Sequence, residues 1–404
     1  MKRHVNTVLF FLILIWIFTI PNTQASLNNL PLFEAFPSLK SKIHHYPLIK
    51  SKTPVYVMKK LESHLNKRGL TLNQNLWVKR DDRSFDPLGG NKSRKLEFLL
   101  ADIIQKKSKT LITAGMYGSN HALATAIAAK KLGLQTKLIL GPQPITKNVR
   151  QKLLAMHSLG AKLDYHGNLL GLGLSLAGAS ISNFFGLDST SYYIPPGGSS
   201  ELGSIGYVNA FFELLKQFEN KPFVDQIIVP VGSGGTAAGL LVGSCLSRQW
   251  EKVQIIGVSV VSNYFYSQNK LRQDAEKLYR FLTSHMSDED RKKVAKCNFK
   301  TSKKALGFTE SYYQPEYGAA NKEVYANINL LKKHEGIMLD PTYSGKAMSY
   351  FIDKAQDIKS NKKMLFWLTY NSYPLSKIID QYQWNSSQEK WKNLPEDFHW
   401  IYQN

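Results

Sequence analysis

The chain is poor in cysteine, with only Cys245 and Cys297 among 404 residues. The two form no CxxC pair and no spacing typical of a zinc site. Two thiols also make no disulfide framework of the kind that small secreted domains use. Cys245 lies in an apolar run with helical character and is interpreted as a core residue. We therefore expect neither a metal site nor a catalytic cysteine.

Acidic residues are scarce relative to basic ones: 30 Asp and Glu stand against 52 Lys and Arg, and the formal net charge is +22. Such a balance favours anionic partners. The basic residues are spread out, however, and acidic residues interleave with them in the densest stretch, 270–304. No RNA-recognition motif, metal-finger spacing, heptad pattern or fixed-period repeat is present. We expect no nucleic-acid partner.

The apolar run near the N-terminus is too short for a bilayer span. Val8–Ile20 covers 13 residues, whereas a membrane helix needs about 20. Basic residues precede the run, Pro21 ends it, and Thr23-Gln24-Ala25 supplies small residues where a signal peptidase cuts. We predict a signal peptide over 1–25, export to the periplasm or the outside, and no stable membrane span after cleavage. An uncleaved N-terminal anchor is the alternative.

Hydrophobic residues make up 43% of the chain, enough for two or three globular domains at this length. Short apolar runs alternate with helical stretches, which indicates parallel βαβ units. The predicted strands are 110–113, 136–140, 161–165, 226–231, 253–258 and 363–369, and the predicted helices are 121–132, 148–159, 206–217 and 236–248. A charged, helix-prone stretch at 265–310 is interpreted as an insertion or a lid-like segment.

The most informative segment is Gly89-Gly90-Asn91-Lys92-Ser93-Arg94-Lys95-Leu96-Glu97-Phe98. It places Lys92 between a glycine turn and the start of an apolar-periodic helix. An amine in such a place can form an imine with a cofactor aldehyde and then act as a base at a substrate α-carbon. Lys79, Arg94 and Lys95 are expected to lower its pKa and favour the neutral amine. The alternative is that Lys92 and Lys95 are ordinary lysines of a first helical turn.

A second glycine loop lies between a strand and a helix at Gly232-Ser233-Gly234-Gly235-Thr236. Successive backbone N–H groups and a hydroxyl at a helix N-terminus make an anion site. The loop is not a phosphate loop of the Walker type, because no Lys-Ser/Thr follows its last glycine. It also lacks the acidic residue about 20 positions on that a dinucleotide fold requires. One lysine and one phosphate cradle are the minimal parts of a pyridoxal-phosphate enzyme; a plain βα turn is the alternative.

Three further segments carry polar groups suited to a substrate. Gly115–His121 is another strand-to-helix turn, whose N–H groups suit a carboxylate and whose Ser119, Asn120 and His121 offer hydrogen bonds. A Ser or Asn helix cap is the alternative. The other two segments are Gln314-Pro315-Glu316-Tyr317-Gly318 and Leu339-Asp340-Pro341-Thr342-Tyr343-Ser344-Gly345-Lys346-Ala347.

In order and spacing these segments resemble the 1-aminocyclopropane-1-carboxylate deaminase and D-cysteine desulfhydrase family of pyridoxal-phosphate enzymes. The resemblance covers about 54–346, is weakest at 265–310, and extends to Lys79–Asp82, Pro196–Ser199 and Gly203–Tyr207. It implies an α/β protein of fold type II, similar to the tryptophan synthase β subunit, with two three-layer domains. The expected large cofactor-binding domain combines 26–94 and 203–404, and the small inserted domain is 95–202. The resemblance also implies a homodimer.

The resemblance assigns a role to each motif. Lys92 matches the Schiff-base lysine, and Asn120 matches the asparagine that bonds the ring oxygen of the cofactor. The phosphate loop corresponds to Gly232, Ser233, Gly234, Gly235 and Thr236, and Asn91 joins the cofactor-binding set. Ser119, Tyr317 and Tyr343 match substrate-side catalytic residues, and Ser344 falls where a residue faces the pyridine nitrogen.

Two positions separate the two chemistries of this family. The deaminases resemble one another in having glutamate at the position of Ser344 and glutamine at that of His121. A hydroxyl and a histidine there favour α,β-elimination from a small amino acid such as D-cysteine, to pyruvate, ammonia and the leaving group. Cyclopropane-ring deamination is the alternative.

The sequence also departs from the family pattern. Gly118 replaces a glutamine, and Tyr370-Asn371-Ser372 replaces a glycine-rich stretch. These departures, the signal peptide and the positive charge leave a second alternative, an exported non-enzymatic binding protein on the same fold.

Overall fold

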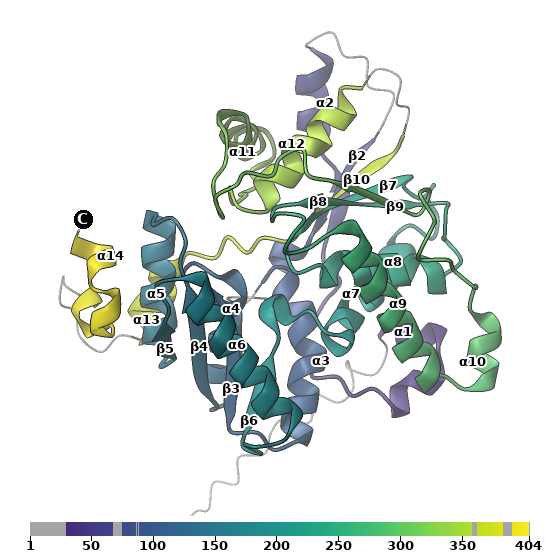
Figure 1. Ribbon diagram of the computed structural model, residues 1–404. Helices are drawn as coiled ribbons and strands as arrows, with labels where there is room; N and C mark the ends of the chain where they lie inside the picture. The colour runs from purple at the N-terminus through teal and green to yellow at the C-terminus, as the bar shows by residue number, and fades with distance from the viewer. Residues whose placement is uncertain are drawn as a thin grey trace, which may run out of the picture.

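The computed structural model describes residues 30–67, 75–85, 87, 89–357, 362–382 and 390–403. Within them the chain forms two sheets, one of six strands and one of four (Figure 1). The predicted signal peptide lies outside the described residues. No helix within these ranges is both long enough and apolar enough to cross a membrane.

The six-stranded sheet has the order β1-β2-β10-β7-β8-β9 and is parallel except at β1. Its strands are β1 (Val55–Val57), β2 (Leu76–Arg80), β10 (Met364–Leu368), β7 (Gln226–Val231), β8 (Gln254–Ser259) and β9 (Leu306–Thr309). Every residue of β7 and β10 is buried. Helices cover both faces of the sheet. A central strand is therefore buried on both faces, and its sequence is a continuous apolar run and not an alternation of apolar and polar residues.

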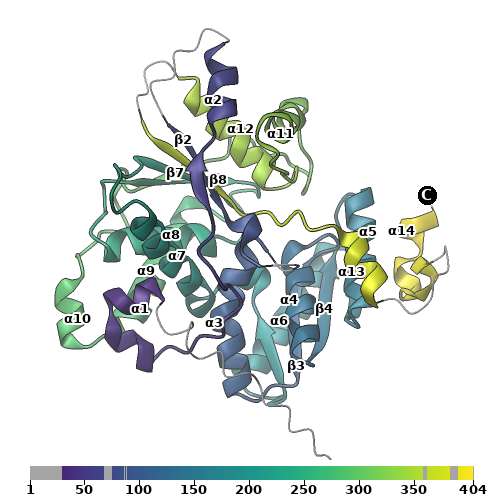
Figure 2. The same cartoon turned by 180° about the vertical axis from the view of Figure 1, so that it is seen from behind.

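One face of this sheet packs on α1 (Pro31–Ala35), α7 (Glu201–Gln217), α8 (Gly235–Leu246) and α9 (Gln268–His285). The opposite face packs on α2 (Lys59–Asn66), α11 (Lys322–Glu335) and α12 (Ser344–Ala355). The two helical layers lie on either side of the sheet in Figures 1 and 2.

The four-stranded sheet is wholly parallel, in the order β5-β4-β3-β6. Its strands are β3 (Thr110–Met116), β4 (Gln135–Gly141), β5 (Lys162–Tyr165) and β6 (Ser191–Ile194). Its largest core includes side chains of α3 (Asn91–Gln105), α4 (Asn120–Lys131) and α5 (Lys147–Ser158), and α6 (Leu169–Phe184) packs on a smaller cluster with β3 and β4. The predicted strands and helices are confirmed, although α7 begins five residues before its predicted start.

The prediction that 265–310 forms a lid-like segment is wrong. Leu271, Leu278 and Leu282 of α9 lie in the main core, and β9 extends the large sheet. The helix α10 (Asp288–Lys293) follows α9. The amphipathic spacing of α9 was hidden by its high charge, because long basic side chains occupy its outer face.

The interpretation of the two cysteines also needs correction. Cys245, on α8, is buried as predicted, but it forms a disulfide with Cys297, 52 residues later. The bond ties α8 to the segment after α10 within the large-sheet core. A single pairing over such a separation cannot be read from spacing alone, because neither cysteine belongs to a local motif.

The C-terminal segment crosses from the large sheet to the small one (Figure 2). After β10, the chain forms α13 (Leu375–Tyr382), which lies against α5, and α14 (Trp400–Gln403). Ile378, Ile379, Phe398 and Ile401 belong to the core of the small sheet. The sequence division placed all of 203–404 with the large sheet, whereas this apolar stretch packs on the other one. Short 3-10 turns occupy Pro37–Ser41, Asp81–Arg83, Pro196–Gly198, Lys390–Asn393 and Glu396–Phe398.

Candidate active site

The predicted site residues gather where the carboxyl ends of strands from both sheets meet. Strands β2, β10 and β7 of the large sheet lead directly into Asp81, Thr369 and Gly232. Strands β3 and β6 of the small sheet lead into the 115–121 turn and into Gly197. Parallel sheets place ligands at this edge, because the strand ends and the helix N-termini converge there.

Lys92 lies in the first turn of α3. The turn before it has Gly90 at φ +76°, where a Cβ would lie 2.5 Å from the carbonyl oxygen of Thr369. The N–H of Asn91 donates to that same oxygen over 3.0 Å. Only glycine allows this approach, so the turn fixes the start of α3 against the end of β10.

The amine of Lys92 is buried and weakly bonded. Its Nζ donates to the carbonyl oxygen of Gly197 over 3.3 Å. Burial lowers the pKa of Lys92 to about 8, because the charged form loses its hydration. The predicted direction is confirmed, but its cause is corrected from neighbouring positive charge to burial. A pKa near neutrality leaves part of the amine uncharged, as a nucleophile and a base require.

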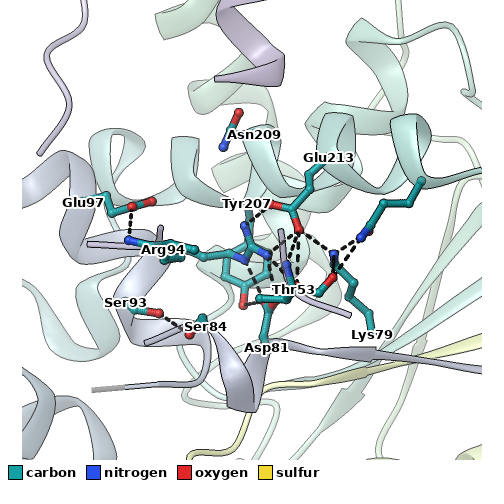
Figure 3. Close-up of polar contacts among 12 residues, drawn as sticks. Thr53, Lys79, Asp81, Ser84, Ser93, Arg94, Glu97, Tyr207, Asn209 and Glu213 are labelled. Carbon is teal, nitrogen blue, oxygen red and sulfur yellow. Dashed lines mark hydrogen bonds and ion pairs between the residues drawn. The ribbon is translucent and has the colours of Figure 1, made fainter. Parts of the chain in front are cut away.

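Two of the positive neighbours invoked from the sequence, Lys79 and Arg94, belong to a separate buried ion network (Figure 3). Arg94 pairs with Asp81 at 2.8 Å and with Glu213 at 3.0 Å, and Lys79 pairs with Glu213 at 2.5 Å. Thr53 donates its hydroxyl to Asp81 over 2.9 Å. Their charges are compensated locally, so they do little to the amine of Lys92.

This network joins four elements, namely α3, α7, β2 and β10. Asp81 follows β2, and it accepts hydrogen bonds from Tyr207 of α7 and Trp367 of β10, each over 2.7 Å. Glu213 comes from α7 and reaches both Arg94 of α3 and Lys79 of β2. The network therefore holds the helix that carries Lys92 at a fixed position relative to β2, β10 and α7.

The Gly232–Thr236 loop meets the amine of Lys92 at Gly197. Gly197 has φ +71°, and a Cβ there would collide with Oγ of Ser233 and lie 3.6 Å from Nζ of Lys92. Asn91 donates its amide to Oγ1 of Thr236 over 3.0 Å. The structure thus brings the predicted lysine and the predicted phosphate loop into one site.

Two residues missed by the sequence reasoning complete the loop. Ser199 Oγ lies 2.8 Å from Oγ of Ser233 and accepts from the N–H of Gly235 over 3.2 Å. Lys95 Nζ donates to Ser199 Oγ over 2.8 Å and to the Gly197 carbonyl over 3.0 Å. Lys95 is 1% exposed, and burial, followed by the charge of Lys92, lowers its pKa well below the ordinary value. Its three-residue spacing from Lys92 was the available signal, since i and i+3 share a helix face.

This cluster fits a phosphate monoester. It offers backbone N–H groups at the N-terminus of α8, three hydroxyls and a buried ammonium. Among the described residues, Lys95 has no carboxylate partner. A buried cation without a counter-charge is costly, so an anion bound here stabilises it.

The 115–121 turn contains Ser119, which caps α4, and His121, on which the charges of Lys92 and Lys95 act. Ser119 caps α4 by accepting from the N–H of Ala122 over 3.2 Å, which confirms the capping alternative for that side chain. His121 lies 3.0 Å from Oγ1 of Thr113. Burial, and then the charges of Lys92 and Lys95, keep the pKa of His121 well below its ordinary value. The charged form of His121 is therefore disfavoured.

Tyr317 and Tyr343 meet through their hydroxyl groups. A Cβ at Gly232 would lie 2.9 Å from Cε1 of Tyr343, so this ring lies against the phosphate loop. Burial raises the pKa of Tyr343 to about 12 and that of Tyr317 well above its ordinary value. Both phenols stay protonated near neutral pH and can donate a hydrogen bond.

Ser344 is wholly buried at the start of α12. Its hydroxyl donates to Oδ1 of Asp340 over 2.5 Å, and its oxygen accepts from the N–H of Asp340 over 2.8 Å. The carboxylate of Asp340 also accepts from the N–H groups of Tyr343 and Ser344, both over 2.9 Å. Asp340 thus accepts from N–H groups at the start of α12 and orients the Ser344 hydroxyl; that Ser344 faces a pyridine nitrogen stays a prediction.

A pocket opens beside Lys92. Lys92, Asn120, Lys152 and the 369–375 segment line it. Gly232–Thr236, Tyr317 and Tyr343 do not, so the predicted residues form two adjoining parts of one site. The segment includes Tyr370 and Asn371, which replace the glycines of the family pattern, and Asn371 donates to the carbonyl oxygen of Pro87 over 2.5 Å.

Comparison with known proteins supports the same cofactor class. The family model described as pyridoxal-phosphate dependent enzyme matches residues 50–369. A D-cysteine desulfhydrase of Klebsiella pneumoniae (strain 342) is 34% identical over 338 residues, covering 81% of this chain and 90% of its own. A putative 1-aminocyclopropane-1-carboxylate deaminase of Pyrococcus abyssi is 32% identical over 333 residues, covering 81% and 92%.

Solved structures show the same fold. A crystal structure described as an ACC deaminase homologue superimposes with a TM-score of 0.67 at 29% identity, covering 86% of this chain and 98% of its own. An L-serine ammonia-lyase from Rhizomucor miehei gives a TM-score of 0.53 at 16% identity, covering 82% and 99%, and shows the fold alone. From the buried amine of Lys92, the anion cradle and these matches together, the chain belongs to the fold type II pyridoxal-phosphate-dependent enzymes, and pyridoxal phosphate is its cofactor.

Proposed function

We propose that this enzyme is a lyase that removes the α-proton and a β-substituent from a small amino acid, as in D-cysteine desulfhydration. The observation that carries the proposal is the buried amine of Lys92, held 3.3 Å from the Gly197 carbonyl beside the phosphate loop. Bound pyridoxal phosphate supplies an electron sink for the α-carbon. Nζ of Lys92 would take the α-proton and pass it on to the leaving group, so that D-cysteine loses hydrogen sulfide.

The surrounding groups support elimination in stated ways. Tyr317 and Tyr343 are protonated donors placed against each other and the loop, so they can bond a leaving group or a carboxylate. Elimination from D-cysteine consumes one water and gives pyruvate, ammonia and hydrogen sulfide.

Deamination of 1-aminocyclopropane-1-carboxylate is the second candidate. One observation favours it: the Ser344 hydroxyl is bonded to the carboxylate of Asp340. A carboxylate is therefore hydrogen-bonded to Ser344, the residue at the position where the deaminases have glutamate. The reaction opens the ring, consumes one water and gives 2-oxobutyrate and ammonia.

The test is to supply the purified enzyme with D-cysteine, L-cysteine and 1-aminocyclopropane-1-carboxylate. We expect pyruvate and sulfide from a cysteine enantiomer, and Lys92→Ala as the control should give neither. Formation of 2-oxobutyrate alone would replace elimination by ring opening. An enzyme that binds pyridoxal phosphate and turns over none of the three would favour the non-enzymatic binding protein.

We further propose that the protein is exported after loss of residues 1–25. The Cys245–Cys297 disulfide supports this, because such bonds persist in oxidising compartments and are rare in the cytosol. N-terminal sequencing of the protein recovered from cell fractions should give Ser26 as the first residue in an extracytoplasmic fraction. Recovery of the intact N-terminus in the membrane fraction would favour the anchored form.

A homodimer is proposed as the assembly. Sedimentation velocity of the 26–404 chain should give a species of twice the chain mass, and a monomer at all concentrations would contradict it.

A further inference from the structure

Lys152 is a buried cation that lines the same pocket as Lys92. It lies on α5, and the residue is 7% exposed. Its Nζ donates to the carbonyl oxygen of Gly118 over 3.1 Å. In the part of the chain that the structure describes, no carboxylate lies within ion-pairing distance of it. An ammonium has three donor hydrogens, so one carbonyl leaves most of its capacity unused.

The carboxylate of Asp340 raises the pKa of Lys152, against the larger opposite effect of burial. That carboxylate is already engaged by the N–H groups of Tyr343 and Ser344 and by the Ser344 hydroxyl. It also acts on Lys346, a second buried lysine. Asp340 therefore does not neutralise Lys152, and burying a charge without a counter-charge is unfavourable. An anion bound in the pocket would stabilise the charged form of Lys152.

The 115–121 turn explains why this chain needs such a residue. The N–H of Gly118, one of the groups expected to hold a substrate carboxylate, donates instead to Oε1 of Gln143 over 2.8 Å. A Cβ at Gly118 would lie 2.9 Å from Cγ2 of Val149 and 3.1 Å from Nε2 of Gln143. The space beside Gly118 is thus filled by Gln143 and Val149, and the amide is closed to a carboxylate. Lys152 offers a positive donor at the same residue.

We propose that Lys152 binds the α-carboxylate of the amino-acid substrate, in place of the amide of Gly118. The inference rests on the proposed function, because it requires an amino acid in the pocket. The cofactor phosphate is not the anion, because Lys95, Ser199 and Gly235 form its cradle and none of them lines this pocket. Lys152 contacts the substrate and sets which substrates are held, and Lys92 performs the chemistry.

The experiment measures binding to the enzyme with its cofactor bound. D-alanine and L-alanine carry the α-amino and α-carboxyl groups but no β-leaving group, so neither is consumed by elimination. Each is titrated while the visible absorption of the bound cofactor is followed. In Lys152→Met the half-saturating concentration of the enantiomer that binds should rise about ten- to a hundredfold, the range for a lost hydrogen bond to a charged group.

Three comparisons separate binding from a structural role. Lys152→Arg keeps the charge and should recover most of the affinity. Lys147→Met removes the same charge from an exposed position of α5 and should leave the affinity unchanged. The melting temperature of Lys152→Met should not fall, because methionine replaces a buried and uncompensated charge by an apolar chain of similar length. In turnover, Lys152→Met should raise KM with little change in kcat.

Some results would overturn the inference. Equal alanine affinity in Lys152→Met and the parent would exclude a carboxylate contact. Weaker binding of D- or L-aspartate together with unchanged binding of alanine would assign Lys152 to a side-chain carboxylate instead. A parent enzyme whose cofactor spectrum responds to neither alanine would contradict the proposed function itself, whereas a normal parent response with an insensitive Lys152→Met variant contradicts only this inference.

Discussion

The two halves of the active site differ in how they are built. The cofactor wall, comprising Gly232–Thr236, Lys95 and Ser199, relies on backbone N–H groups, hydroxyls and one buried ammonium. The substrate wall, comprising the 115–121 turn, Gln143, α5 and 369–375, relies on side chains from separate elements, among them Gln143, Lys152 and Asn371. The first matches the family motif, and the second carries both departures. A phosphate imposes one geometry, whereas substrates differ, so the substrate wall is where a member of this family can change.

The strongest test removes the residue shared by both walls. Lys92→Ala should lower turnover at least about a thousandfold, since the amine acts as nucleophile and base. Its melting temperature in the absence of cofactor should not fall, because the buried charge is lost with the side chain. Turnover is measured by product formation with the substrate that the parent uses. Retained turnover would move the chemistry to another group of the site.

A second test breaks the frame behind both walls. Asp81→Asn leaves Arg94 without its closest carboxylate and should cost about 3–5 kcal/mol of unfolding free energy, as expected for a broken buried ion network. Glu276→Gln, which removes an exposed ion pair with Arg280, should cost about 0–1 kcal/mol. Urea unfolding of both variants gives the comparison. Similar small losses in the two would show that the network contributes little.

The cofactor wall alone is tested by Lys95→Met. Loss of a charged donor to the phosphate should weaken pyridoxal-phosphate binding about ten- to a hundredfold. The affinity of the cofactor-saturated variant for alanine should stay close to that of the parent, in contrast to Lys152→Met. Cofactor affinity is read from the visible absorption during titration. Equal effects of both lysines on both ligands would abolish the distinction between the walls.

A finer test concerns Ser344. The change Ser344→Glu introduces a carboxylate where the deaminases have one and should shift the visible spectrum of the bound cofactor. The physical reason is that a carboxylate holds the pyridine nitrogen protonated. Ser344→Ala provides the control for loss of the bond to Asp340. An unchanged spectrum in the glutamate variant would show that residue 344 does not face the ring.

The last test concerns the pH dependence of stability in the cofactor-free protein. The pKa of both Lys92 and Lys152 is lowered by burial to about 8. Because the unfolded chain binds more protons than the folded one between about pH 8 and 10, stability due to these groups rises with pH over that window. The difference in unfolding free energy between the parent and Lys152→Met should therefore move in favour of the parent as pH rises. A pH-independent difference would contradict the lowered pKa.

Much of the fold could be predicted from the sequence, because the patterns that indicate its helices and strands are local. Glycine turns before α3 and α8, and apolar runs such as 226–231, predict their elements through backbone sterics and hydrophobic periodicity. The segment 265–310 was misinterpreted, because its buried leucines are diluted by charged residues on the outer face. The packing of α13 on the small sheet was also missed, since nothing local tells an apolar helix which of two cores it joins.

The site shows the same division. Lys92 and the Gly232–Thr236 loop were predicted from short motifs, because an imine-forming amine and a phosphate cradle need particular residues at particular turns. Lys95 was noted only as a neighbour, and Ser199 and Gln143 were not given a role. Their parts depend on contacts between residues 25 to 104 positions apart in the chain, and local spacing does not predict such contacts.

The sequence by itself determined the alternation of strands and helices, the lysine, the phosphate loop and, through them, the cofactor class. Only the tertiary structure decided that burial sets the pKa of Lys92, that Arg94 and Lys79 belong to an ion network, that Cys245 meets Cys297, and that Lys152 enters the pocket. The reason is physical: motifs fix the local backbone, whereas desolvation and charge compensation depend on which distant side chains the fold brings together.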